Sequence, residues 1–433
     1  MMSKVSPGRA TISRSRSCIK VWLCCCCKNR YWPAKSCLYR AMHLLHLQSS
    51  MSVTSPYSFD ILIAGAGPAG CACALALGKA GLKVALADKA TFPRDKVCGD
   101  AIPGRAIATL AAIDRGYADE FMAFAQKLET RHTRLWYKSK HITIDWVRPA
   151  FTSPRMAFDN FLLELVKTHT NTTVFTSTEI NKYEANNIGY KIFTKDTSLS
   201  FEAKLVIGAD GAHSITAKQL GQHVVDKAHY AGSVRAYYDQ VTGLQPDTTY
   251  IYFIPQYLPG YLWVFPLPGN VANVGFGMLS SEISKRRLNL KAALDDCIAL
   301  VPELKDNFLH ASRIDKPEGF GLPFGSAMGS ASGERFLLAG DAASLIDPLS
   351  GDGIGNAMLS GKMAANHAID AFMNNSFSHS FLASYDKQLQ QRLKKEFQRH
   401  YFAQKILYRY PALLDMLFAA GQSKLVKKLI RKM

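Results

Sequence analysis

A group of glycines near the beginning of the chain has the spacing needed to hold a diphosphate. The glycines follow the apolar segment 59–64, which predicts a strand, and they precede an alanine-rich stretch, which predicts a helix. Gly65 permits a tight turn, Gly67 lets the backbone approach a pyrophosphate, and Gly70 lets the helix pack closely on the strand. A second predicted strand ends at Asp88, whose carboxylate can accept hydrogen bonds from ribose hydroxyls. This order predicts a dinucleotide-binding turn.

Two cysteines, Cys71 and Cys73, lie on the predicted helix that follows this turn. Their neighbours are alanines, and small residues allow a helix to pack closely on a sheet. We therefore interpret both thiols as core residues and not as metal ligands. Beyond residue 50 the other cysteines, Cys98 and Cys297, are scattered, and no spacing typical of a zinc site occurs. The sequence predicts no metal centre, and its cysteine usage is typical of a reducing cytoplasm.

A second group of residues suited to cofactor chemistry lies far downstream. The apolar segment 335–341 predicts a strand that ends at Asp341, and the glycine-rich run 350–355 opens another predicted helix. The carboxylate of Asp341 could bind hydroxyls in the middle of an extended FAD. The amides of Gly353 and Ile354 could face the electron-rich end of a flavin ring. The alternative interpretation is a glycine-rich turn that only caps the helix.

Several longer motifs occur in one order along the chain: GAGPAG (65–70), KVCGDAI (96–102), RMAFDNFL (155–162), GADG (208–211) and AGDAASLIDPLSGDGI (339–354). This series resembles FAD-dependent oxidoreductases of the para-hydroxybenzoate hydroxylase type, and within them it is most similar to the geranylgeranyl reductase family. A further motif, PGYLWVFP (259–266), resembles the aromatic motif of these reductases. It differs from flavin halogenases, which carry Trp at the position of Tyr261.

The resemblance implies FAD as the cofactor, with contacts at Ala69, Asp88, Gly99, Arg155, Asp341, Gly353 and Ile354. Arg155 can donate charged hydrogen bonds to the pyrophosphate, but an ion pair with Asp159 on the same helix is the alternative. In the wider family the carboxylate at the position of Asp210 supports the FAD segment. Asp88 and Asp352 replace glutamates that are usual in the family, which keeps the charge and shortens the reach.

The motifs indicate the electron donor and the reaction less directly than they indicate the cofactor. No second glycine-rich turn with a following strand and acid occurs, so no permanent nicotinamide domain is predicted. We expect transiently bound NAD(P)H or a reduced ferredoxin as the donor. The resemblance implies that the reduced flavin hydrogenates C=C bonds of a geranylgeranyl-type isoprenoid lipid. An FAD-dependent monooxygenase and a non-catalytic electron-transfer module are the alternatives, because one fold can host each of them.

Residues 230–277 alternate in a pattern of period two, which predicts strands of an antiparallel sheet. The resemblance places this sheet over the flavin, where Tyr261, Trp263 and Phe265 would line a cavity for a hydrophobic or prenyl-lipid substrate. Alternating aromatic residues are equally typical of a packed core face. Saturating an alkene needs a proton besides a hydride, and Cys98 and Tyr261 are our candidates for the proton donor. The alternative for Cys98 is a small residue in a tight turn.

The distribution of charge argues against a nucleic-acid partner. The chain has 52 Lys and Arg against 34 Asp and Glu, a net charge of +18. Residues 1–50 contribute nine basic residues and no acid, and the segment after Asp415 contributes five, which leaves only +4 for the body. A nucleic-acid groove needs clustered Lys and Arg on a folded face, so we exclude this class of partner.

The two ends of the chain are predicted to lie outside the folded body. The basic, cysteine-rich leader 1–57 is expected to be disordered or to precede a translation start at Met51; a signal peptide is not favoured, because its apolar stretch is short. Residues 424–433 predict a basic amphipathic helix. This helix would contact anionic lipid at the inner membrane surface, or it would pack on the body. We expect a cytoplasmic protein, because no apolar run is long enough to span a bilayer.

These patterns predict an α/β fold with a Rossmann-like FAD-binding domain of the para-hydroxybenzoate hydroxylase type. The FAD-binding domain would be discontinuous, formed by residues 58–225 and 325–371. An antiparallel β-sheet substrate domain, residues 226–324, would be inserted between them, with some of its segments interleaved in the first part. Residues 372–433 would form a helical C-terminus. The sequence does not indicate an oligomeric state.

Overall fold

The computed structural model describes residues 56–221, 226–421, 423 and 427. The residues from Pro56 onward form one compact unit. Almost all of the predicted leader and the predicted start at Met51 lie outside the described residues, as does nearly all of the predicted basic helix at the C-terminus. Within the described ranges, no helix is both long enough and apolar enough to cross a membrane.

The first sheet carries the glycine-rich turn. Its strands are β1 (Tyr57–Ala64), β2 (Val84–Ala87), β6 (Thr173–Phe175), β7 (Ile180–Ala185), β8 (Tyr190–Thr194), β9 (Ser200–Gly208), β16 (Ser332–Gly333) and β17 (Phe336–Leu338). The order β17-β9-β1-β2-β6 is parallel throughout, and Leu62 pairs with Ala85 on one side and with Val206 on the other. These strands are continuous apolar runs because helices and connections cover both faces of a parallel sheet.

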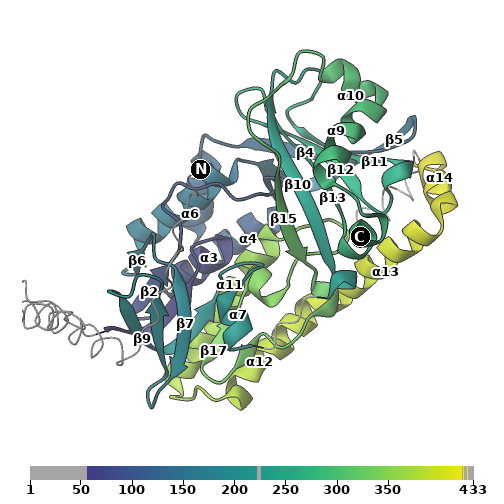
Figure 1. Ribbon diagram of the computed structural model, residues 1–433. Coiled ribbons are helices and arrows are strands. Elements are labelled where there is room, and N and C mark those ends of the chain that lie inside the picture. The colour runs from purple at the N-terminus through teal and green to yellow at the C-terminus, as the bar shows by residue number, and fades with distance from the viewer. Residues whose placement is uncertain (1–55, 222–225, 422, 424–426, 428–433) are drawn as a thin grey trace, which may run out of the picture. The chain divides into compact units, whose positions relative to one another are not determined.

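The second sheet is largely antiparallel. Its strands are β3 (Ala101–Ile102), β4 (Leu128–Tyr137), β5 (Lys140–Thr152), β10 (Tyr230–Asp239), β11 (Thr248–Phe253), β12 (Tyr261–Leu267), β13 (Val271–Leu279), β14 (Ser312–Arg313) and β15 (Glu318–Pro323). Its order is β14-β10-β13-β12-β11-β4-β5-β3, with β15 paired to β10, and β11 runs parallel to β4. The two sheets occupy opposite ends of the compact unit in Figure 1.

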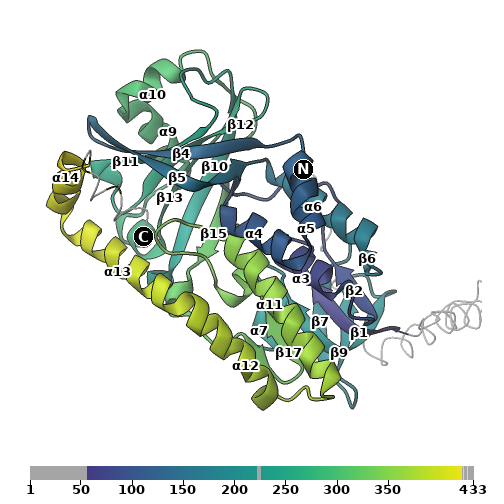
Figure 2. The same ribbon diagram turned by 180° about the vertical axis from the view of Figure 1, so that it is seen from behind.

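The helices of the described residues are α3 (Pro68–Leu77), α4 (Gly104–Ile113), α5 (Arg115–Ala123), α6 (Arg155–His169), α7 (Ile215–Gln219), α8 (Ser280–Arg286), α9 (Leu290–Leu300), α10 (Pro302–Asn307), α11 (Ile354–Met373), α12 (His379–Leu389), α13 (Lys395–Arg409) and α14 (Pro411–Ala419). Short 3-10 turns and a π-helical segment between α12 and α13 complete the list. Figure 2 shows α12, α13 and α14 along one edge of the compact unit.

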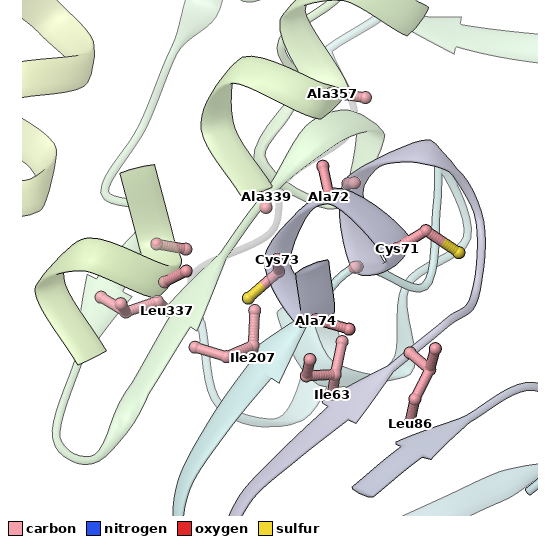
Figure 3. Packing of buried hydrophobic residues seen from close by; sticks show 14 of the residues in the cluster. Ile63, Cys71, Ala72, Cys73, Ala74, Leu86, Ile207, Leu337, Ala339 and Ala357 are labelled. Carbon is pink, nitrogen blue, oxygen red and sulfur yellow. The ribbon is translucent and has the colours of Figure 1, made fainter. Parts of the chain in front are cut away.

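Helix α3 is buried on almost every side because it lies between the first sheet and α11. Cys71 and Cys73 are completely buried, and Figure 3 shows them packed among aliphatic residues of the sheet and of α11. Their predicted role as core residues is confirmed. The contact with α11 is close, since a Cβ atom on Gly361 would lie only 2.1 Å from the carbonyl oxygen of Ala69.

The predicted fold class is confirmed, with differences in the limits of its elements. The helix predicted after the second glycine-rich run is α11, which continues to Met373, and α12, α13 and α14 follow within residues 372–433, where a helical C-terminus was predicted. The second sheet takes three strands from residues 101–152, within the part where interleaved segments were predicted, besides those predicted within residues 230–277. The division into two domains stays a prediction.

Candidate functional site

The turn between β1 and α3 is built so tightly that two of its glycines, Gly65 and Gly70, cannot be replaced without a clash. Gly65 has a φ of +99°, and a Cβ atom there would lie 2.3 Å from the carbonyl oxygen of Ala209. A Cβ atom on Gly70 would lie 1.8 Å from the Gly65 carbonyl oxygen. The turn therefore brings the N-terminus of α3 against the ends of β1 and β9.

The N-terminus of α3 offers backbone donors. The capping position is Gly67, which has no side chain to accept a hydrogen bond, and the first turn of the helix contains no acid. Asp88 stands at the end of β2, where its carboxylate accepts hydrogen bonds from the backbone N–H groups of Ala66 (2.8 Å) and Ala90 (2.8 Å). Asp88 thus holds the turn in place. Its predicted contact with ribose hydroxyls stays a prediction.

A cluster of charged residues lies beside this turn. Arg155, at the start of α6, donates two hydrogen bonds of 2.7 Å to the buried carboxylate of Asp159. Arg94 Nη1 lies 3.0 Å from the same carboxylate, and its Nη2 lies 3.6 Å from where a Cβ atom on Gly67 would be. Burial opposes ionisation of Asp159, but Arg155 and Arg94 hold its pKa below the usual value. The predicted role of Arg155 at the pyrophosphate stays a prediction.

Arg94 was missed by the sequence analysis. Its Nη1 atom is buried and makes no well-aligned hydrogen bond within the described residues, although it is paired with Asp159. A guanidinium next to Gly67 and to the open N-terminus of α3 suits a diphosphate. The only sequence signal was its place between Asp88 and the KVCGDAI motif (96–102).

The downstream motif meets the first one through the packing of α3 on α11. A Cβ atom on Gly340 would lie 3.1 Å from the Cβ of Ala69, so the two motifs are in contact. Next to it, Asp341 pairs with Lys96 at 2.9 Å, and its Oδ1 lies 3.5 Å from where a Cβ atom on Gly353 would be. The structure thus brings Ala69, Asp341 and Gly353 together, as binding of one extended cofactor requires.

The N-terminus of α11 faces the same region. Its cap residue is Gly353, which has no side chain, and the preceding Asp352 accepts a hydrogen bond from the N–H of Gly355 at 3.1 Å. Burial raises the pKa of Asp352 to about 6. The amides of Gly353 and Ile354 have no backbone partner in the part of the chain that the structure describes. They remain available to a ligand.

Side chains of α13 form hydrogen bonds that hold the loop before α11 in place. Asp347 accepts hydrogen bonds from the backbone of Leu349 (2.9 Å) and Ser350 (2.8 Å), and its other oxygen pairs with His400 Nδ1 at 2.5 Å. Both side chains of the pair are buried, and the hydrogen bond to Asp347 raises the pKa of His400. Gln404, one turn further, donates to the Pro348 carbonyl at 3.0 Å. The sequence analysis missed these residues of α13.

One group of potential metal ligands lies at the same place. Atoms of Asp347, Glu396 and His400 lie within 4.8 Å of one another. Glu396 accepts two hydrogen bonds from Arg105 (3.0 and 3.2 Å) and Asp347 pairs with His400 Nδ1, whereas the buried His400 Nε2 has no hydrogen-bond partner within the described residues. This arrangement suits a hydrogen-bonded network that joins α4, α13 and the loop.

Aromatic residues of β12 lie against both cofactor motifs. The phenol of Tyr261 lies 3.3 Å from the Ser350 carbonyl oxygen, at the loop before α11. A Cβ atom on Gly99 would lie 3.2 Å from the Phe265 ring and 3.4 Å from Trp263 Nε1. Trp263 is buried, whereas Tyr261 and Phe265 are half-buried. The structure brings these residues together; their contact with substrate stays a prediction.

The segment around Cys98 is fixed by a buried polar network. Asn273 on β13 donates to the Cys98 carbonyl (2.7 Å) and to the Asp100 carboxylate (2.8 Å), and it accepts a hydrogen bond from Trp263 Nε1 (2.8 Å). Tyr237 donates to the same carboxylate at 2.7 Å. Asp100 is completely buried, and this burial raises its pKa to about 7. The network ties the cofactor segment to the second sheet, and sequence patterns did not reveal it.

Cys98 itself is half-buried, and its thiol interacts with the guanidinium of Arg155. The Tyr261 ring lies 6.2 Å from the Trp263 ring, and Cys98 precedes Gly99, which lies against Trp263 and Phe265. Asp210 accepts hydrogen bonds from Ser214 (2.5 Å) and from the backbone of Thr216 (3.0 Å), which stabilises the start of α7. Its expected support of the FAD segment stays a prediction.

Comparisons with known proteins agree with this geometry. Residues 58–400 match the family described as FAD binding domain. The chain is 29% identical over 318 residues to a menaquinone reductase of Mycobacterium tuberculosis, which covers 71% of this chain and 76% of that protein. It is 28% identical over 354 residues to a digeranylgeranylglycerophospholipid reductase of Methanopyrus kandleri, covering 78% of this chain and 88% of that protein.

A solved structure is also similar. The geranylgeranyl bacteriochlorophyll reductase-like protein of Thermoplasma acidophilum superimposes with a TM-score of 0.72 at 25% identity, over 86% of this chain and 93% of that one. FAD fits the residues present here, because Gly65 to Gly70 form a cradle, Arg94 offers a buried and poorly bonded nitrogen, and two helix N-termini offer amides. The chain belongs to the family of the FAD binding domain, and it is an FAD-dependent oxidoreductase.

Proposed function

We propose that this enzyme hydrogenates C=C bonds of a geranylgeranyl-type isoprenoid lipid. The observation that carries the proposal is the aromatic patch of β12, where the half-buried Tyr261 lies against the loop that precedes α11 and the half-buried Phe265 lies against Gly99. An apolar wall with few polar groups beside a flavin-binding helix suits a hydrophobic substrate that has few groups able to form hydrogen bonds. The similarity to reductases whose names specify digeranylgeranyl and geranylgeranyl substrates supports the same substrate class.

The residues around the patch have distinct roles in this proposal. When bound and reduced, FAD supplies a hydride; the other alkene carbon then needs a proton. Burial raises the pKa of Tyr261 to about 12, so its phenol keeps its proton at neutral pH and can donate it to a forming carbanion. The thiol of Cys98 is the second candidate for this donation. Asn273 and Asp100 hold Cys98 in position.

The electron donor and the cellular location belong to the same proposal. Transiently bound NAD(P)H or a reduced ferredoxin would reduce the flavin. The enzyme would act in the cytoplasm at the inner membrane surface, where its substrate is dissolved. The basic residues 424–433, which lie outside the described residues apart from Lys427, would contribute to this peripheral contact.

The test reduces the bound FAD without oxygen, adds a geranylgeranyl lipid, and follows flavin reoxidation together with product mass. We expect reoxidation with a mass gain of about 2 Da for each reduced bond, since a hydride and a proton are added. Tyr261→Phe and Cys98→Ala should retain FAD, and replacing the true proton donor should slow reoxidation by about 100-fold. Tyr257→Phe, a change of the same kind outside the patch, is the matched control.

Other outcomes separate the alternatives. A flavin that stays reduced with lipid and reacts only when oxygen enters would favour a monooxygenase. Electron transfer to artificial acceptors without any change in lipid mass would favour a non-catalytic electron-transfer module. Either result would overturn the proposed reduction.

A further inference from the structure

We propose that α13 and α14 form the surface by which the protein docks on an anionic lipid bilayer. The inference rests on the proposed function, because an isoprenoid dissolved in a membrane must reach the site from that membrane. It concerns described residues that take no part in the flavin or substrate contacts above. It is also separate from residues 424–433, on which the sequence-based expectation of membrane contact was placed.

Helix α13 has a basic outer face. Its exposed residues recur every three or four positions and so share one side of the helix: Lys395, Arg399, Phe402, Lys405 and Arg409. The opposite side carries the buried Phe397 and His400, which pack on the body. Phe402 lies in the middle of the basic residues and is 66% exposed. An aromatic ring surrounded by cations is the composition of a helix that rests at a lipid headgroup layer.

The positive charge of this face is not compensated. The acids of the two helices are engaged elsewhere, because Glu396 pairs with Arg105 at 3.0 Å and Asp415 pairs with Lys138 at 2.6 Å. Within the described ranges, no ion pair involves the four basic residues of the face. Anionic headgroups attract such residues. A symmetric contact between two copies would instead bring like charges together.

Helix α14 continues this surface with apolar residues. Leu414 and Phe418 pack on β4 and β5, whereas Leu413 and Met416 on the other side are 37% and 67% exposed. Tyr410, at the junction of the two helices, is 56% exposed. A cationic helix followed by a helix with an exposed apolar side can place charge on the headgroups and apolar side chains below them.

The surface leads directly to the aromatic patch. The ring of Phe418 on α14 lies 6.3 Å from that of Phe253, which lies 6.2 Å from Tyr261. Figures 1 and 2 agree that α13 and α14 lie along an outer edge of the compact unit. Docking there would place the bilayer on the outer side of α14, whose buried inner side is two ring contacts away from the proposed proton donor. The position therefore favours a membrane over other partners.

The experiment sediments the full chain with vesicles of phosphatidylcholine containing about 30% phosphatidylglycerol. We expect binding that weakens between about 0.05 and 0.5 M NaCl and is much weaker with phosphatidylcholine alone. Replacing the four basic residues of α13 by Gln should lower the partition coefficient by about 10-fold or more. Phe402→Ser with Met416→Ser should lower it by about 10-fold, because less apolar surface enters the bilayer.

Two matched controls use the same kinds of change elsewhere. Gln at the exposed positions Lys167, Lys195, Lys291 and Lys305 removes the same charge, and Leu309→Ser with Met373→Ser removes side chains that are 73% and 79% exposed. Equal binding by the test and control variants would overturn the proposal. The proposal would also be overturned if, in the absence of vesicles, only the α13 and α14 variants changed the protein from a dimer to a monomer.

The readout also separates this inference from the proposed reduction. Vesicle binding is measured without turnover, and lipid reduction is measured with detergent-dispersed substrate. The α13 and α14 variants should reduce that dispersed lipid at the wild-type rate while losing activity on vesicle-embedded lipid. Vesicle binding by a protein that reduces neither form would leave docking supported and the reduction refuted.

Discussion

The pairing of His400 with Asp347 controls the loop beside the flavin site at the scale of single residues. Asp347 organises the turn through the amides of Leu349 and Ser350, and His400 fixes the orientation of the Asp347 carboxylate. Burial opposes the ionised form of Asp347, but His400 and the amides keep its pKa below the usual value. The charged groups nearest to the pair are Glu396 and Arg399 of α13. A change at His400 should therefore affect stability and the loop together.

We expect His400→Gln to lower the free energy of unfolding by about 3 kcal/mol at pH 5 to 6, because it breaks a buried ion pair. The pKa of His400 is raised on folding, so its contribution is fully present below about pH 6.5 and is lost as the pH rises through the folded value. The difference from wild type should shrink at pH 8.5, and it should also shrink in acid as the pH falls through the lowered folded pKa of Asp347. Urea unfolding of wild type and variant at several pH values measures this difference in the free energy of unfolding.

The exposed His310→Gln is the control for this variant, and it should show no such pH window. A loss for His400→Gln that is equal at pH 5 and pH 8.5 would contradict an ion pair and favour simple packing of the imidazole. The spectrum of bound FAD gives a second readout, because a displaced loop should shift its absorbance bands.

The glycine-rich turn and α3 act as one element. The strand, the turn and the helix are joined through atoms so close together that Gly65 and Gly70 have no room for a side chain. Gly67 differs from both. It has an extended conformation that other residues adopt, and a Cβ atom there would make only an ordinary contact, at 3.6 Å from Arg94. A side chain at this position would therefore be tolerated by the fold and would obstruct only a ligand.

For this reason we expect Gly67→Val to fold normally and to bind FAD at least about 100-fold more weakly, since a side chain blocks the approach of the pyrophosphate. Flavin absorbance after purification and titration of the apoprotein with FAD measure the loss, and circular dichroism reports the fold. Gly329→Val is the matched control, because no atom lies within 4 Å of its Cβ position. A folded Gly67→Val protein with full flavin would refute the assignment of this turn.

At the scale of the whole molecule, the buried network around Asn273 fixes the second sheet to the segment between β2 and β3, which connects the two sheets. Asn273 stands on β13, and its amide holds the Cys98 carbonyl and Asp100, which belong to the segment between the glycine-rich turn and α4. Tyr237 on β10 supports the same carboxylate. Since these groups are buried, removing one member leaves others without a partner. The network should make the two sheets unfold together.

We expect Asn273→Ala to lower the free energy of unfolding by about 3 kcal/mol, because three buried polar groups lose a hydrogen bond. Of the five tryptophans, Trp136, Trp146 and Trp263 lie in the second sheet, so once Trp22 and Trp32 are replaced by Phe in wild type and variants alike, tryptophan fluorescence follows that sheet while circular dichroism follows the helices. In urea the two probes should coincide for wild type. Separate transitions in wild type would contradict the coupling. The exposed Asn187→Ala should change nothing.

The sequence alone determined the parts of this protein that depend on neighbours along the chain. The strand, turn and helix around residues 59–77 and the start of α11 follow from apolar runs and glycines whose local geometry permits little else. The period of two in residues 230–277 likewise predicted strands. Interleaved segments in the first part of the chain were predicted, but not that these would be β4 and β5, because strand pairing between distant segments depends on how those segments pack.

Only the tertiary structure decided which side chains meet. Asn273 and Cys98 lie 175 positions apart, and His400 and Asp347 lie 53 apart, so no local pattern indicates that they touch. Arg94 acquires its place beside Gly67 only when its segment folds over the turn. Such contacts form only when the long segments between the two residues fold. Which two residues meet therefore depends on how the sheets and helices pack, and not on the types of the two residues alone.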